Sequence, residues 1–181
     1  DYEALIIADL QTPFSEADKY QIDQYVMHGG RLLWVLDGVM FSNDILSKDG
    51  YTPVIAKDLN VQDLLFRYGV RVSPTLLQDL QCLPVPVDVS GDPSNPNFQP
   101  MPWYYAPLLL TSDASPITRN VGQVSSMFCS GLEFVGGDDG LRKEVLLATS
   151  SASRAIGVPA EVDLSLIEMT PNQFPHAYIP V

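Results

Sequence analysis

The chain has 181 residues, of which 46% are hydrophobic and only 18% charged, which indicates one folded globular domain and excludes a disordered chain. Its formal net charge of -12 argues against nucleic acid or an anionic membrane surface as a direct partner, because both require basic patches. Acidity of this kind otherwise favours solubility.

The N-terminal stretch has the pattern of a strand, a helix and a second strand. The short apolar run Ala4–Ala8 predicts a buried strand. Ser15 and Asp18 resemble a capping box at the start of a helix, and Gly29–Gly30 predicts its end. The apolar run 31–36 then predicts a second strand, parallel to the first.

The middle of the chain gives weaker signals. Residues 39–59 form a long connection with a possible turn of helix near its start. We predict a helix that begins with Asn60 as its N-cap and ends at Gly69, followed by a strand at 70–72. Another strand is predicted over 75–82.

Seven prolines in the span 84–107 exclude a central helix or strand there. We therefore expect an extended surface excursion with edge-strand pieces. Trp103, Tyr104 and Tyr105 lie at its end and could bind a partner or simply pack onto the body of the domain. Beyond it, strands are predicted over 124–135 and 144–148, with a turn at 136–140 between them.

Polar side chains follow several of the predicted strands, at the position where parallel sheets bind ligands. Hydroxyl groups and an arginine can together hold a phosphate, a carboxylate or a sugar. The alternative is structural: hydroxyls that cap turns, an arginine paired with a local carboxylate, and aspartates that form turns. The candidate ligand-binding residues are Asp9, Thr12, Asp37, Ser150, Ser151, Ser153 and Arg154.

The sequence contains no P-loop, dinucleotide fingerprint or nucleophile elbow. His28 and His176 have no partners at metal-ligand spacing, so we expect no metal and no cofactor. Cys82 and Cys129 form neither a disulfide framework nor a metal motif, and their residue types favour buried small apolar groups. The compartment and the redox state of the thiols stay open on this basis.

Several stretches together resemble one family. They are Leu5-Ile6-Ile7-Ala8-Asp9 through Thr12-Pro13-Phe14-Ser15-Glu16 to Ile22-Asp23-Gln24-Tyr25-Val26-Met27-His28-Gly29-Gly30, then Asp63-Leu64-Leu65-Phe66-Arg67-Tyr68-Gly69-Val70-Arg71, Leu77-Gln78-Asp79-Leu80-Gln81-Cys82, Ser115-Pro116-Ile117-Thr118-Arg119-Asn120 and Leu146-Leu147-Ala148-Thr149-Ser150-Ser151-Ala152-Ser153-Arg154. The likeness is to the gliding-motility-associated, GldG-type auxiliary subunit of an ABC-type transport system, and it covers nearly the whole chain.

The resemblance implies a non-catalytic extracytoplasmic domain on the periplasmic face of the inner membrane. Its partners would be an ABC permease and ATPase, with a homo-oligomer also open. Membrane helices outside the chain would anchor it, so we expect 1–181 to be a single domain excised from a longer protein. The implied fold is α/β, a three-layer sandwich with a mostly parallel sheet similar to class I glutamine amidotransferases and flavodoxin, with antiparallel additions and the Pro-rich excursion. The alternatives are a solute- or sugar-binding domain, or a hydrolase on the same fold.

Overall fold

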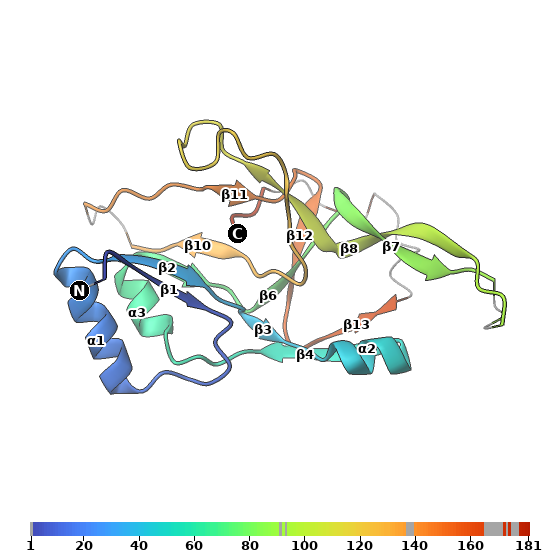
Figure 1. Cartoon of the computed structure of the whole chain (residues 1–181), viewed down its shortest axis with the longest axis horizontal. Coiled ribbons are helices and arrows are strands. Elements are labelled where there is room, and N and C mark those ends of the chain that lie inside the picture. The colour runs from blue at the N-terminus through green and yellow to red at the C-terminus, as the bar shows by residue number, and fades with distance from the viewer. Residues whose placement is uncertain are drawn as a thin grey trace.

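A computed structural model describes residues 2–90, 92, 94–136, 140–164, 172, 174 and 178–181 (Figure 1). The helices are α1 (Glu16–Met27), α2 (Asn43–Asp49) and α3 (Gln62–Arg67). The strands of the first half are β1 (Ala4–Ala8), β2 (Arg31–Val35), β3 (Val39–Met40), β4 (Tyr51–Ala56), β5 (Val70–Val72), β6 (Thr75–Asp79) and β7 (Cys82–Asp88). Those of the second half are β8 (Phe98–Thr111), β9 (Val124–Ser125), β10 (Leu132–Phe134), β11 (Leu147–Ala148), β12 (Ser153–Gly157) and β13 (Ala160–Asp163).

The predicted β1–α1–β2 unit is confirmed in its order and in the parallel pairing of its strands, but the prediction that the strands are buried is wrong, because alternate residues of both are exposed. β1 and β2 pair in parallel, with Ile6 opposite Leu33. The capping box is present, because the Ser15 Oγ accepts a hydrogen bond from the Asp18 N–H and the Asp18 side chain accepts one from the Ser15 N–H. After α1, Gly29 adopts a left-handed φ of 86° that reverses the chain into β2.

The predicted mostly parallel three-layer sandwich is wrong. Among the described residues, β1 and β2 form the one parallel pair, and every other pairing is antiparallel. The strands fall into several small sheets, β10–β5, β11–β8–β7 with β9, β12–β6 and β13–β4–β3. The crossover through α1 is of the kind that parallel strands require. Most of the other pairings join strands far apart in the chain, such as β5 with β10, β6 with β12 and β4 with β13, and these pair antiparallel.

Several predicted boundaries also change. The long connection at 39–59 contains β3, α2 and β4, and α2 begins where Ser42 caps the Ile45 N–H. The strand predicted over 124–135 is divided into β9 and β10, because the chain turns at Phe128, whose φ is 53°. β6 ends at Asp79, three residues before the predicted strand does, and β11 covers only the last two residues of 144–148.

Asn60 is not the N-cap of α3. That position belongs to Val61, which makes no side-chain capping bond. Asn60 instead has a left-handed φ of 54°, and its Nδ2 donates to the Phe14 carbonyl oxygen at 2.8 Å. It therefore ties the segment before α1 to the segment before α3, a long-range role that its position in the sequence does not reveal.

Two hydrophobic clusters hold the described part of the chain together. The larger one joins α2, β4, β6, β8 and β13 through Leu46, Val54, Leu76, Trp103, Tyr105, Ala106 and Val162, together with Val39 and Phe128. The smaller one consists of Leu59, Val61 and Leu65 around α3, and Phe14 and Trp34 pack against it. The rings of Phe14 and Trp34 meet edge to face, 6.0 Å between centroids, so the smaller cluster joins α3 to the β1–α1–β2 unit.

Only part of the Pro-rich span predicted as a surface excursion, 84–107, leaves the body of the domain. Trp103, Tyr104 and Tyr105 are buried, and β8 lies between β11 and β7, so the prediction that no central strand forms there is wrong. β7 and β8 form a long antiparallel hairpin that extends away from the rest of the molecule, toward the right of the view (Figure 1). No described helix is long and apolar enough to cross a bilayer.

Candidate functional site

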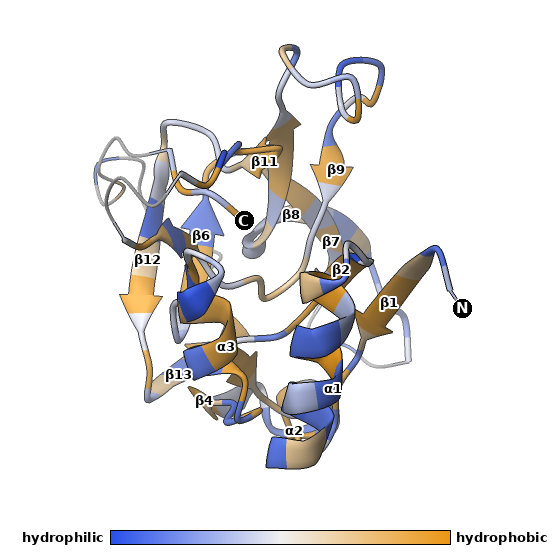
Figure 2. Cartoon of the chain, turned by 90° about the vertical axis from the view of Figure 1, so that its left-hand side faces the viewer, coloured by the Kyte–Doolittle hydropathy of each residue, from blue (hydrophilic) through white to orange (hydrophobic). Residues whose placement is uncertain are grey.

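The β1–β2 sheet has one covered face and one open face. Leu5, Ile7, Leu32 and Trp34 point to the covered side, where α1 packs, and each is half-buried. On the other side Ile6 is 66% exposed, and Leu33 and Val35 are each 54% exposed. Ile6 lies opposite Leu33 and Ala8 opposite Val35, so these four residues form one continuous surface, which we call the apolar face. Figure 2 shows β1 as a strongly hydrophobic strand at the border of the molecule.

A face of this kind is unusual for parallel strands. Parallel sheets are normally covered on both sides, and an isolated pair of strands is only marginally stable. Among the described residues, no other strand pairs with β1 or β2, and nothing buries the apolar face. Contiguous exposed apolar side chains generally mark an interaction site.

The strand-end residues of the predicted ligand site are exposed. Asp9 follows β1 with a left-handed φ of 50°, and the Gln11 amide donates to its carboxylate. Thr12 is exposed in the same loop. Asp37 follows β2, and its carboxylate pairs with the Lys57 ammonium, with 3.3 Å between Asp37 Oδ2 and Lys57 Nζ.

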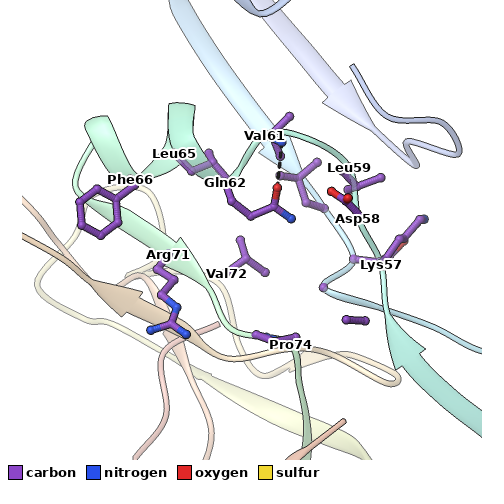
Figure 3. A pocket seen from close by; sticks show the side chains of 14 residues that line it. Lys57, Asp58, Leu59, Val61, Gln62, Leu65, Phe66, Arg71, Val72 and Pro74 are labelled. Carbon is purple, nitrogen blue, oxygen red and sulfur yellow. Dashed lines mark hydrogen bonds and ion pairs between the residues drawn. The ribbon is translucent and has the colours of Figure 1, made fainter. Parts of the chain in front are cut away.

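Asp37 also borders a pocket of about 360 Å³ between the end of β2, the segment before α3 and β5 (Figure 3). The other predicted ligand residues do not line it. Its apolar wall comes from Leu36, Ala56, Leu59, Val61, Leu65, Phe66, Val72 and Pro74, and its polar groups from Asp37, Lys57, Asp58, Gln62 and Arg71.

Asp37, Lys57 and Arg71 at this pocket each form an ion pair. The Asp58 carboxylate accepts a hydrogen bond from the Asn60 N–H. The Lys57 side chain is only 12% exposed and is held by Asp37. Arg71 lies 3.6 Å from Glu133 on the neighbouring strand β10. The Gln62 side-chain oxygen accepts the Val61 N–H at 3.0 Å. The pocket therefore presents a mainly apolar surface with an ion pair at its border, which suits a small amphipathic molecule or an inserted side chain.

The segment 149–154 packs into the structure through its polar groups. Asp79 is fully buried, and its carboxyl group accepts hydrogen bonds from the Ser150 N–H at 2.6 Å, the Ser150 hydroxyl at 2.5 Å and the Gln81 N–H at 2.8 Å. A buried carboxyl group requires such partners, since an unpaired one costs several kcal/mol. Ser153 is also fully buried, and its hydroxyl bonds that of Thr149 at 2.7 Å. Ser151, which lies between Ser150 and Ser153 in the chain, is half-buried.

Arg154 makes contacts of the same structural kind. Its Nε donates to Gln78 Oε1 at 2.6 Å, and its guanidinium lies 5.0 Å from the centre of the Phe174 ring. The structure thus gives Ser150, Ser153 and Arg154 internal partners and does not bring them to the pocket that Asp37 borders. These contacts are structural in kind, as in the alternative, but Arg154 bonds the distant Gln78 amide where the alternative expected a local carboxylate, and the sequence pattern missed both Gln78 and Asp79 as partners. The one sequence signal for this internal network was Asp79, a charged residue inside a predicted strand, 75–82.

The three aromatic residues proposed for partner binding lie in the core. Trp103 is 4% exposed, Tyr104 7% and Tyr105 2%. Trp103 and Tyr105 contact the Phe128 ring, with centroids 6.1 Å and 5.7 Å away, and Tyr104 contacts Phe174. The alternative that these residues pack onto the body of the domain therefore describes their positions.

Cysteine and histidine chemistry gains no support from the geometry. Burial raises the pKa of both thiols, Cys82 and Cys129, which lowers the fraction of reactive thiolate at neutral pH. His28 caps the end of α1, with its Nδ1 2.6 Å from the Gln24 carbonyl oxygen. His176 lies outside the described residues. Within the described part of the chain, no three His, Cys, Asp or Glu side chains are grouped as a metal site would require.

The comparisons with known proteins decide the family. Residues 1–181 match the family described as "ABC-type uncharacterized transport system". The chain belongs to this family. It is therefore an auxiliary protein of an ABC-type transport system, and membership links it to a membrane transport process. Neither a curated protein nor a solved structure gives a significant match.

Proposed function

We propose that this ABC-type transport auxiliary protein is a non-catalytic binding and assembly module, and that the apolar face of the β1–β2 sheet is its docking surface. The observation that supports this most is the exposure of Ile6, Leu33 and Val35 side by side on a parallel sheet. Complete burial of a fully exposed aliphatic side chain contributes about 1.5–3 kcal/mol, and these three are a little over half exposed, so each can contribute roughly 1–2 kcal/mol to a complex.

The proposed setting follows the family resemblance. The domain works on the extracytoplasmic side of the membrane, beside the permease and ATPase of its transport system, and is held there by segments outside 1–181. The net charge of -12 favours contact with protein over contact with an anionic lipid surface. An association with gliding motility rests on the resemblance alone.

The test is co-purification of the permease and ATPase with the protein as the cell makes it. Leu33→Asp places a charge at the centre of the apolar face and should reduce recovery of both subunits by about tenfold or more, since an unpaired charge in an interface is strongly unfavourable. Val35→Lys should act in the same way with the opposite charge. The matched control is Ile117→Asp, because Ile117 is 70% exposed but lies away from β1 and β2 in the chain.

All three variants should melt close to the unmodified protein, because the substituted side chains are exposed. Normal recovery of both subunits with folded Leu33→Asp and Val35→Lys would overturn the proposal.

The pocket beside Asp37 favours a second candidate function, binding of a small solute. Lys57 could exchange its contact with Asp37 for a carboxylate of the solute while the apolar wall covers the hydrocarbon part of the solute. This candidate predicts that a small amphipathic carboxylate raises the melting temperature, and that Lys57→Met removes the shift. A screen of such compounds that leaves the melting temperature unchanged would contradict it.

A further inference from the structure

The hairpin of β7 and β8 carries its prolines in facing pairs. Pro84 lies opposite Pro102, and Pro86 lies opposite Pro100. We call the residues from Pro84 to Pro102 the proline arm. Figure 1 shows that this arm projects well beyond the other sheets of the molecule.

Proline has no backbone N–H group, and the hydrogen-bond register of the hairpin shows which edge each proline nitrogen faces. Near the tip, the Val89 N–H donates to the Asn97 carbonyl oxygen, so odd-numbered residues of β7 form the hydrogen-bonded pairs. The four prolines therefore occupy the pairs without cross-strand bonds, and their nitrogens face the two outer edges of the arm. Both edges lack N–H groups at alternate positions, which prevents another strand from adding to either side.

A partner must therefore bind to one of the two side-chain faces of the arm and not to its strand edges. On one face Pro84, Pro86, Pro100 and Pro102 are exposed, and Phe98 beside them is 62% exposed. On the opposite face Val85 and Met101 are half-buried, and Val85 packs against the larger hydrophobic cluster. The proline side, which we call the proline face, is a rigid apolar surface that loses little conformational entropy on binding.

The charge of the arm restricts its partner. The sequence has no lysine or arginine between Arg71 and Arg119, and the charged residues of the arm are Asp88 and Asp92, both acidic. Asp88 accepts hydrogen bonds from the Ser90 and Asn97 N–H groups at its tip, which lower the pKa of its carboxyl group and keep it ionised. Two arms placed together would bring like charges into contact, and a basic partner segment would be attracted.

We propose that the proline face docks an aromatic and basic segment of another protein of the transport system, face on and without strand addition. Aromatic rings pack well on proline surfaces, as they do when aromatic-lined grooves bind Pro-rich peptides, and the basic groups would meet Asp88 and Asp92. This inference names a second contact and rests on the proposed role as an assembly module.

The test is photo-crosslinking in cells that express the complete transport system. A photoreactive residue in place of Phe98 lies on the proline face, and one in place of the exposed Gln99, the next residue, lies on the opposite face. We expect crosslinks from position 98 to a component of the transport system, at a segment whose sequence contains aromatic residues and Lys or Arg. Position 99 should give at least about fivefold less of the same product.

Three results would overturn the inference: equal crosslinking from both positions, crosslinks to lipid or to a second copy of the chain, and no crosslink from position 98. The outcomes separate the two proposals. Loss of subunits with Leu33→Asp together with no crosslink at position 98 would leave the assembly role standing and remove the arm from it.

Discussion

At the residue scale, the turn between α1 and β2 requires two glycines for different reasons. Gly29 has a φ of 86°, where a side chain is strained, although a Cβ would meet no neighbour there. Gly30 has no such backbone strain, but a Cβ at this position would overlap the ring of Tyr25. The Tyr25 hydroxyl lies 3.2 Å from the Tyr2 carbonyl oxygen and 3.3 Å from that of Arg31, so its single proton is shared between the two acceptors. Gly30 thus lets this side chain join the starts of both strands.

Gly29→Ala should therefore destabilise the domain by about 1–2 kcal/mol, the cost of a left-handed conformation with a Cβ. The control is Gly122→Ala, where φ is not positive and a Cβ would also meet open space. Denaturant unfolding measures both. Equal stability of Gly29→Ala and Gly122→Ala would contradict the strained turn.

A second residue-scale prediction concerns Tyr68, at the end of α3. Burial first, and then its hydrogen bond of 2.9 Å to Asp23, raise the pKa of Tyr68 to about 12. Because the folded pKa lies above the ordinary value of 10, this stabilisation is complete below pH 10 and is lost as the pH rises toward 12.

The difference between the alkaline absorbance titrations of the unmodified protein and Tyr68→Phe isolates this phenol. Asp23→Asn should move its midpoint downward, because the amide removes the negative charge that disfavours tyrosinate. A Tyr68 midpoint near 10 in the unmodified protein would show that the phenol is exposed in solution.

Residues whose role is local were predictable from the sequence, and residues whose partners are distant were not. Ser15 caps the Asp18 N–H three residues on, and Gly29 ends its own helix. Ser150, by contrast, bonds Asp79, 71 residues away, and nothing near either residue indicates the other. From the sequence alone, the Ser150 hydroxyl fits a ligand-binding site as well as it fits an internal hydrogen bond.

At the element scale, a buried lysine joins α1 to the start of α3. Lys19 is 5% exposed, and its ammonium lies 2.8 Å from Glu16 and 3.1 Å from Asp63. The hydrogen bond to Lys19 is the main cause that lowers the pKa of both carboxyl groups. Their contribution to stability is therefore present above the ordinary values of 4.5 and 3.8 and is lost as the pH falls through the folded values.

Lys19→Met should lower the melting temperature at pH 7, and the gap to the unmodified protein should narrow as the pH falls below 4 and the carboxylates are neutralised. Lys48→Met is the control, because Lys48 is exposed in the last turn of α2. The difference in melting temperature between Lys48→Met and the unmodified protein should stay small from pH 7 to pH 3. A Lys19→Met gap that does not change between pH 7 and pH 3 would contradict the role of the ion pairs.

The proline arm gives a second prediction at this scale. Replacing Pro84, Pro86, Pro100 and Pro102 with threonine restores N–H donors along both edges while keeping high strand propensity. Self-association measured by sedimentation should rise severalfold at equal protein concentration. Pro96→Thr, in the loop at the tip, should leave it unchanged. An unchanged sedimentation profile of the fourfold variant would show that the edges were not protected by proline.

The elements also show why the fold class was mispredicted. The mostly parallel sheet was implied by the family resemblance, and the β1–α1–β2 unit agreed with it because such units usually belong to parallel sheets. Here β3 to β13 pair antiparallel, and strands such as β9 and β11 have only two residues. Strands this short carry no hydrophobic alternation from which pairing could be inferred. The extended conformation of the Pro-rich span was predictable because proline acts on its own backbone, but the burial of Trp103 and Tyr105 depends on Phe128, which is distant in the chain.

At the scale of the whole molecule, the two proposed contacts differ in character. The apolar face belongs to the β1–β2 sheet, left of the centre in Figure 1, and the proline face belongs to the arm that extends to the right of that view. The first is aliphatic, with Ile6, Leu33 and Val35, and the second is bordered by Asp88 and Asp92. A module with two such surfaces can contact two partners, or two parts of one partner, at the same time.

Side-chain footprinting tests the central claim most directly, because it measures solvent access at the apolar face in the free and the assembled protein. Hydroxyl radicals label exposed aliphatic side chains, so Ile6, Leu33 and Val35 should react readily in the free protein. In the assembled transport system their labelling should fall at least about fivefold, while Ile117, which is 70% exposed, stays reactive. Undiminished labelling of Ile6, Leu33 and Val35 in the intact complex would contradict docking through this face.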